Sequence, residues 1–520
     1  MKRDEDMGPH HRGDEFQTDD EENQAQRVCE DDSETDSEDK KSPSRCHSRI
    51  STDSETQMWP QSYRVSMDMV SVTPPSISFL KGTNATGITS SFTYKRSQLS
   101  DSNSPLSRPF LPEHISDKEF PTSTLPADVS ASRRSHSTCN EFSQGENKSS
   151  LVQATINGTN VLCGISLLTT PYALKESGWS GIILLSIIAI ICYYTATLLR
   201  KCLESSPGLH TYPDIGQAAF GRPGRIATSI LLYLELYAAC VEFIIMMADN
   251  LSTVFPNTSM NFAGMHLDSN QTFSLISTLV VLPTVWLRDL SLLSYLSVGG
   301  LGASALLGLC LLWVGVVDKV GFHPTGTVLD LANLPVAVGI FGFGFSGHSV
   351  FPNIYTSMKD PSKFSSVLQT SFIFVWFLNA AVALCGYLMF GDSVKSQFTL
   401  NMPSELLASK IAVWTTVVTP MAKYALLITP VASSLEELVP STQLNPYFVS
   451  LVVRTILVFS TLVVGLTLPF FGYLMALIGS LLAMIVAVIL PCVFYLIILH
   501  EQVNKLQFNT LYSLVLYRLA

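Results

Sequence analysis

Two apolar stretches of the sequence are interrupted at their centres by residues that could bind a small polar ligand. The first interruption runs from Asn157 to Ser166 and the second from Phe341 to Ser349. Both are rich in glycine and small polar residues. Irregular backbone at membrane depth is tolerated only where it is buried in protein or lines a wet cavity. Two such interruptions in separate spans therefore predict a transporter-type binding site.

The ends of broken helices indicate which chemistry this site could perform. The second half of a broken helix begins with unpaired N–H groups that suit a carboxylate, and the first half ends in carbonyls that suit an ammonium group or a cation. A zwitterionic amino acid fits such a site without charged side chains. The alternative is that the glycines only allow helices to pack closely. The predicted substrate-binding residues are Thr159, Asn160, Cys163, Gly164, Ile165, Ser166, Phe343, Phe345 and Ser346, with N–H groups of Gly164, Ile165 and Ser166 near the substrate carboxylate.

Ionisable residues inside apolar spans are costly, and they are therefore candidates for function. Glu235, Glu242 and Asp249 are spaced seven residues apart, which places them near one helical face. We expect Glu242 to lie deepest and to be the proton-coupling group, together with His348, which follows the second interruption and could titrate near neutral pH. The alternatives are a static buried pair or polar lining for the carboxylates, and a ring bonded to freed backbone for the histidine. Two basic residues in other spans, Lys423 and Arg454, are candidate ion-pair partners.

The elements that must position these residues begin near residue 150, where the composition changes. Residues 1–150 hold 26 Asp and Glu and 17 Lys and Arg, are rich in Ser, Thr and Pro, and show no lasting apolar period. Such a segment cannot bury enough apolar surface to offset its chain entropy, so we predict a disordered, acidic, cytosolic tail. The run Asp31–Asp39 could be a target of kinases, or simply a solvated acidic segment.

Residues 151–500 form the predicted transmembrane core. Residues 151–520 hold only 31 charged residues, and apolar stretches near the ~20 residues needed to cross a bilayer recur along them. Ten cysteines are scattered without metal-ligand spacing, so we expect no disulfide, metal site or cofactor. The ten predicted spans are 151–174, 179–199, 225–254, 272–287, 291–317, 333–357, 365–390, 407–430, 447–468 and 472–499.

The order of the spans predicts an inverted repeat. If spans 1–5 and 6–10 are two units, the odd number in each unit makes span 1 and span 6 start on opposite sides of the membrane. Both interruptions then fall in the first span of their unit, and each is followed by a proline, Pro171 or Pro352. Lys and Arg in the short loops favour the orientation with the N-terminus in the cytosol. The loop 255–271 then faces away from the cytosol.

Several motifs resemble those of the amino acid/auxin permease family. They are Gly158–Gly164, Leu167–Ala173 with Gly178–Trp179, His210–Gly216, Phe341–His348, Phe351–Tyr355 with Met358–Pro361, and Gly386–Gly391. Within the family the chain is most similar to the vacuolar amino acid transporter (AVT) branch, which is related to vesicular inhibitory amino acid transporters. The resemblance covers about 150–500 of the sequence printed here.

The resemblance implies an all-α polytopic membrane protein with the 5+5 inverted-repeat, LeuT-like fold of the amino acid–polyamine–cation superfamily, with broken spans 1 and 6. It also implies proton-coupled movement of neutral L-amino acids across the vacuolar membrane. The family ends in a full eleventh span, whereas residues 501–520 are short and atypical. We expect this difference to affect folding and trafficking rather than the binding site.

The sequence therefore predicts a secondary active transporter whose partners are neutral amino acids, protons and the lipid bilayer. One alternative is an amino acid sensor that binds without useful flux and signals through the tail. Another is a transporter of auxin or a further small organic acid. An enzyme is not expected, because we find no glycine-rich phosphate loop, metal-ligand cluster or nucleophile–base pair. A basic nucleic-acid-binding patch is likewise not expected.

Overall fold

The computed structural model describes the core of the chain and a few residues of the tail. The described residues are 59, 60, 63, 66, 67, 148–262, 265–287, 299–318, 320–323, 326–439, 445–468 and 470–500. Most of the predicted tail and all of the atypical segment 501–520 lie outside them. Of the eight described residues of the predicted tail, 59, 60, 63, 66, 67 and 148–150, Tyr63 and Met67 are buried in the hydrophobic core.

Helices make up almost all of the described core. The elements are α2 (Leu151–Leu162), α3 (Ser166–Ser177), α4 (Gly181–Glu204), α5 (Tyr212–Val254), β1 (Met260–Phe262), β2 (Met265–Leu267), α6 (Ser269–Trp286), α8 (Gly300–Val316), α9 (Leu334–Gly344), α10 (Phe351–Ser357), η2 (Pro361–Lys363), α11 (Phe364–Phe390), η3 (Gly391–Ser393), η4 (Phe398–Asn401), α12 (Leu407–Leu438), α13 (Pro446–Thr467), α14 (Phe471–Ile478), the π-helical turns η5 (Gly479–Ala483) and η6 (Ile485–Ile489), and α15 (Leu490–Ile498).

Each of the ten predicted spans overlaps at least one of these helices, although α4, α5, α6 and α12 extend beyond the predicted bounds. Among the described residues, six helices are long and apolar enough to cross a membrane, and α2 with α3, bent by 49°, makes a seventh. The sequence did not predict the antiparallel hairpin of β1 and β2, which lies between α5 and α6. The predicted fold class is confirmed as a mostly helical bundle of apolar spans.

Both predicted interruptions are present as breaks between helices. Span 1 is divided into α2 and α3 by Cys163–Ile165, and span 6 into α9 and α10 by Phe345–Val350. Pro352 lies in the first turn of α10, where its missing N–H leaves no helical bond unmade. Pro171 lies inside α3 instead, and its ring packs against the span 7 helix, where a Cβ on Gly386 would meet it.

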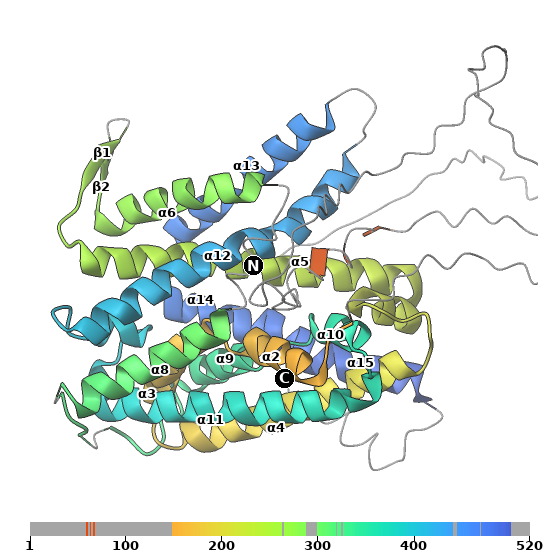
Figure 1. Cartoon of the computed structure of the whole chain (residues 1–520), viewed down its shortest axis with the longest axis horizontal. Helices are drawn as coiled ribbons and strands as arrows, with labels where there is room; N and C mark the ends of the chain where they lie inside the picture. The colour runs from red at the N-terminus through yellow and green to blue at the C-terminus, as the bar shows by residue number, and fades with distance from the viewer. Residues whose placement is uncertain are drawn as a thin grey trace, which may run out of the picture. The chain divides into compact units, whose positions relative to one another are not determined.

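Contacts between equivalent helices support the inverted repeat. Span 1 meets span 6 through α3 and α9, span 2 meets span 7 through α4 and α11, span 3 meets span 8 through α5 and α12, and span 4 meets span 9 through α6 and α13. A pseudo-two-fold axis in the membrane plane brings elements near it against their own counterparts, as this pairing requires. In Figure 1, α2, α9 and α10 lie between α5 and α11.

The first half of span 6 is held by direct contact between backbones. A Cβ added to Gly339 on α9 would collide with the carbonyl group of Ala476 on α14, and one added to Gly479 would collide with the carbonyl group of Gly339. Small residues allow such close approach between membrane helices. Glycine at these positions therefore fixes α9 against span 10 and sets where the span 6 break lies.

Replacing Gly339 by alanine tests this packing. Because the new methyl group meets backbone rather than a movable side chain, we expect the variant to lose about 1–3 kcal/mol of stability. Thermal unfolding of the detergent-purified protein measures the loss. Gly302→Ala is the matched control, since a Cβ at Gly302 on α8 meets nothing within 4 Å. Equal melting temperatures for both variants would contradict the proposed backbone contact.

Candidate substrate-binding site

A small cavity lies where the two broken spans meet. Its volume is about 160 Å³. The breaks are in contact, because a Cβ on Gly344 at the end of α9 would lie 3.1 Å from Cβ of Ser166 at the start of α3. The lining residues come from α2, α3, α5, α9, α12 and the two breaks: Asn160, Val161, Leu162, Gly164, Ile165, Ser166, Glu235, Leu236, Ala239, Phe243, Phe343, Ser346, Ser349, Val350, Lys423, Leu426 and Leu427.

The span 1 break is a tight turn that leaves the start of α3 facing the cavity. The N–H of Cys163 donates to the carbonyl of Thr159 at 2.7 Å, and the N–H of Gly164 donates to the carbonyl of Leu162 at 3.1 Å. The carbonyl of Cys163 accepts a hydrogen bond from the Ser304 hydroxyl of α8 at 3.3 Å. The helix then restarts at Ser166, and N–H groups in a first turn have no preceding turn to bond. They form a site of partial positive charge beside the cavity.

The span 6 break carries a hydroxyl that is bonded to a carboxylate of span 3. The N–H of Ser346 donates to the carbonyl of Phe343 at 3.1 Å, which turns the chain away from α9. The Ser346 hydroxyl donates to Oε1 of Glu235 on α5 at 3.1 Å. Glu235 is 8% exposed and lines the cavity. A titratable group of span 3 therefore bonds directly to a side chain of the irregular segment of span 6.

A lysine from span 8 also lines the cavity. Lys423 on α12 lines the cavity with Asn160 of α2, and both side chains lie beside Gly300 of α8. A Cβ on Gly300 would lie 3.0 Å from Nζ of Lys423 and 2.5 Å from Oδ1 of Asn160. Glu235 and Lys423 are the charged residues among the described lining, and their formal charges cancel. The rest of the wall is largely apolar.

The family model described as "Transmembrane amino acid transporter protein" matches residues 147–517. The chain belongs to this family. It is 56% identical over 463 residues to "Amino acid transporter AVT1D" of Arabidopsis thaliana, covering 88% of this chain and 84% of that protein. It is 55% identical to "Amino acid transporter AVT1E" of the same plant, covering 86% and 85%. It is 28% identical to "Vesicular GABA transporter" of Caenorhabditis elegans, covering 69% and 74%. The resemblance found in the sequence motifs is confirmed.

Six of the nine substrate-binding residues predicted for this transporter line the cavity: Asn160, Gly164, Ile165, Ser166, Phe343 and Ser346. Three face elsewhere. The Thr159 hydroxyl donates to the Thr155 carbonyl at 2.7 Å and lies 3.2 Å from the Ser371 hydroxyl of α11. The ring of Phe345 stacks on Phe372 of α11, with centroids 6.1 Å apart. Cys163 lines a smaller neighbouring cavity of about 60 Å³.

The predicted proton-coupling residues do not line the cavity. Glu242 is fully buried on α5, and neither of its carboxylate oxygens has a hydrogen-bond partner in the described part of the chain. His348 is also fully buried; its Nε2 lies 3.1 Å from the Thr195 hydroxyl and 3.1 Å from the Cys192 carbonyl, both on α4. The histidine thus attaches the span 6 break to span 2.

The other ionisable residues singled out in the sequence have local partners. Arg454 forms an ion pair with Glu436 of α12 at 3.0 Å and donates to the Val285 carbonyl at 2.8 Å, so it does not pair with the span 3 carboxylates. Asp249 accepts hydrogen bonds from Asn270 at 3.1 Å and Gln397 at 3.0 Å. Both residues hold helix ends and loops together, away from the cavity.

Sequence reasoning missed part of the cavity wall. It did not assign Phe243, Ser349 or the span 8 leucines to the site, and it named Lys423 only as an ion-pair partner. The seven-residue spacing correctly placed Glu235 and Glu242 on one side of α5, but it carried no information on which of them faces the breaks. The signal that could have assigned Lys423 to the site is its charge within an apolar span.

Substitution of Gly164 by leucine tests the cavity as the binding site. A Cβ at Gly164 meets nothing within 4 Å, so the larger side chain fits without moving backbone but fills the cavity. We expect the variant to fold and amino acid binding to weaken at least about tenfold, or about 1.4 kcal/mol. Equilibrium binding of labelled amino acids to the purified protein measures this change. Gly302→Leu, on the exposed side of α8, is the control, and equal affinities for both variants would exclude the cavity.

Proposed function

We propose that the chain is a secondary active, proton-coupled transporter of neutral L-amino acids across the vacuolar membrane. The observation that supports this most directly is the meeting of both helix breaks at one small cavity, with Ser346 of one break bonded to Glu235. Membership of a transmembrane amino acid transporter family gives the substrate class. The vacuolar location is part of the proposal, and it rests on the resemblance of the sequence motifs to the vacuolar branch.

The cavity can accept a single zwitterion. The substrate carboxylate would bind the N–H groups that begin α3 at Ser166, and its ammonium group would bind freed carbonyls and the Glu235 carboxylate. The side chain would then contact the apolar wall that includes Phe243 and Phe343. A volume of about 160 Å³ is well below the roughly 300–1,000 Å³ of pockets that hold drug-sized ligands, so one small molecule fills it.

The apolar part of the wall favours neutral substrates. In the proposed binding mode Glu235 contacts the substrate ammonium group, and the substrate side chain lies against the apolar wall that includes Phe243 and Phe343, so a charge on that side chain would be buried there. Burying an unpaired charge costs roughly several kcal/mol of binding free energy, whereas burying an apolar side chain is favourable. Selectivity for neutral amino acids follows from this difference.

Protonation of Glu235 would change its contact with the span 6 break. The ionised carboxylate can only accept the hydrogen bond from Ser346, whereas the protonated group can also donate one. The substrate ammonium and a proton would thus compete for the same oxygen atoms. We assign the coupling proton to Glu235, with Glu242 two turns further along α5 as a second carboxylate that has no described partner when ionised.

Alternating access requires contacts that can break between the moving parts. The hydrogen bond from Ser346 to Glu235 joins the broken span 6 to the long span 3, and the bond from Ser304 to the Cys163 carbonyl joins span 5 to the broken span 1. Rocking of the bundle that contains the broken spans against spans 3 and 8 would open the cavity to each side in turn. The predicted orientation places the N-terminus in the cytosol.

Uptake by the purified protein in liposomes tests the proposed function. We expect an imposed pH difference to drive labelled neutral amino acids against their gradient, because protonation and substrate binding are linked at Glu235. Unlabelled competitors should include acidic and basic amino acids and an indole carboxylic acid that lacks the amino group. Competition by the indole acid alone would favour an organic acid transporter. Saturable binding without flux would favour a sensor.

Replacing Glu235 by glutamine tests the coupling. Glutamine keeps the size and a hydrogen-bonding oxygen for Ser346 but cannot be protonated in this pH range. We therefore expect counterflow exchange to continue with weaker substrate binding, because the amide oxygen still accepts from the substrate ammonium group without its charge, while the stimulation of uptake by the pH difference disappears. Glu242→Gln is expected to have the same effect if both carboxylates carry the proton. Exposed Glu405 on the loop before α12 provides the control Glu405→Gln. Retained stimulation in Glu235→Gln would remove this residue from the mechanism.

A further inference from the structure

Lys423 carries a charge inside an apolar span and has no carboxylate partner among the described residues. It lies within α12 and lines the cavity between the broken spans. None of the ion pairs that the described residues form includes it. A charged side chain inside a membrane span is costly unless other groups compensate it, so its surroundings indicate what it does.

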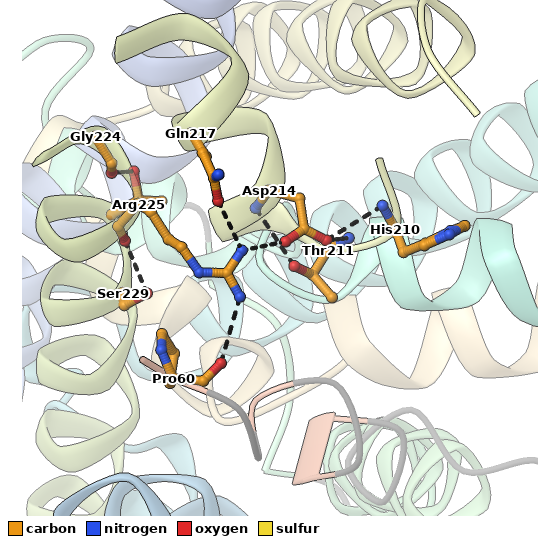
Figure 2. Close-up of polar contacts among 9 residues, drawn as sticks. Pro60, His210, Thr211, Asp214, Gln217, Gly224, Arg225 and Ser229 are labelled. Carbon is orange, nitrogen blue, oxygen red and sulfur yellow. Dashed lines mark hydrogen bonds and ion pairs between the residues drawn. The ribbon is translucent and has the colours of Figure 1, made fainter. Parts of the chain in front are cut away.

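Two arginines of the core are compensated by carboxylates. Arg225 of α5 pairs with Asp214, as Figure 2 shows. Arg454 of α13 pairs with Glu436 at 3.0 Å. Lys423 differs from both, and its charge requires a compensating group of another kind.

The ammonium group of Lys423 lies at the carbonyl end of α2. A Cβ built on Gly300 of α8 would lie 3.0 Å from Nζ of Lys423 and 2.5 Å from Oδ1 of Asn160, so these two polar atoms are neighbours. Asn160 belongs to the last turn of α2, which ends at Leu162. The last carbonyls of a helix carry partial negative charge, and a cation beside them is stabilised. The end of a broken helix therefore takes the place of a carboxylate.

The helix of span 5 holds this arrangement with two residues one turn apart. Gly300 leaves the space in which the side chains of Lys423 and Asn160 meet. Ser304 donates to the carbonyl of Cys163, the residue that directly follows α2, at 3.3 Å. The span 1 break is thus bonded by span 5 and faces a positive charge from span 8.

Lys423 also lines the second cavity, whose volume is about 60 Å³. Gly164 and Ile165 of the span 1 break line both cavities as well. The hydroxyl-bearing residues of the second cavity are Ser304, Thr415, Thr416 and Thr419. A polar cavity of this size has room for water, and an ammonium group has three hydrogens to donate. The lysine can therefore keep its charge at this depth.

We propose that Lys423 is the fixed cation of the span 1 break and acts as a positioning residue. Its ammonium group neutralises the carbonyl end of α2, so the break needs no metal ion at this point. The contact joins the broken span 1 to span 8, and it therefore crosses between the two parts that rock against each other. The substrate ammonium group is then directed to Glu235 instead of the end of α2. This last step rests on the proposed function, whereas the place of the lysine does not.

Hydrogen exchange of the full-length protein tests the place of the cation. Lys423→Met keeps an unbranched apolar side chain but removes the charge. We expect peptides that cover residues 160–166 to exchange about tenfold faster, because the helix end loses its compensating charge. Lys410→Met, at an exposed position in the first turn of the same helix, is the matched control. Unchanged exchange in Lys423→Met would overturn the proposal.

Chemical rescue separates the charge from the packing of the side chain. Lys423→Ala leaves space for a small amine, so we expect propylammonium to restore slow exchange of the same peptides. Lys423→Met should not respond, since its side chain fills that space. Propanol is the uncharged control. Fast exchange in Lys423→Ala that propylammonium does not reverse would show that packing, and not charge, holds the break.

A glycine variant tests the same contact without removing a charge. Gly300→Ala places a methyl group where the ammonium group meets Asn160, so we expect faster exchange of residues 160–166. Gly302→Ala is the control, because its Cβ meets nothing within 4 Å. This pair gives a result even where a lysine variant does not fold. Equal exchange in the two glycine variants would contradict the place assigned to the ammonium group.

Equilibrium binding of a labelled neutral amino acid to the same proteins tests the consequence for the substrate. We expect Lys423→Met to bind about tenfold more weakly and propylammonium to restore affinity in Lys423→Ala. The unaltered chain with propylammonium controls for competition at Glu235. Weaker binding with unchanged exchange would mean that the lysine acts on the substrate alone, against the proposal. Absence of binding in the unaltered chain, with the break protected from exchange, would instead contradict the proposed function.

Discussion

The membrane core depends on the requirement that backbone polar groups in lipid be satisfied within the protein. A continuous helix meets this requirement along its length, and a broken one leaves N–H and C=O groups that need other partners. Here the N–H groups of Cys163 and Gly164 bond within the turn of span 1, and the Cys163 carbonyl accepts a hydrogen bond from the Ser304 hydroxyl. The cavity lies beside both breaks, and this is where we propose that a zwitterion binds.

Packing around the breaks determines how the freed backbone groups are placed beside the cavity. The backbone contacts of Gly339 and Gly479 fix the first half of span 6, and the contact between Gly344 and Ser166 brings the two breaks together. His348 then fixes the second break itself to span 2 through the Cys192 carbonyl. The residues that the sequence marked as candidates for function thus divide into those that face the cavity and those that hold its walls in position.

The charged groups divide in the same way. Glu235 and Lys423 face the cavity, whereas Arg454 with Glu436 and Asp249 with Asn270 and Gln397 connect helix ends. Arg225 belongs to the second group in the core but also contacts the tail at Pro60. A single arginine thereby links the capping box at the start of α5 to a segment more than a hundred residues earlier in the chain.

The sequence by itself determined the family, the helical spans, the positions of both breaks and three of the six polar side chains in the cavity wall, Asn160, Ser166 and Ser346. It could do so because broken apolar runs and family motifs are local features of the chain. Only the tertiary structure decided that Thr159 and Phe345 face α11, that Glu235 rather than Glu242 meets the breaks, and that Lys423 completes the wall. The rotation of each helix about its own axis depends on the neighbouring helices. When a helix is apolar on nearly every face, the periodicity of its sequence does not indicate this rotation. The packing of Tyr63 against Tyr233 was equally hidden, because two aromatic residues in a polar tail form no period and their partner lies in a distant span.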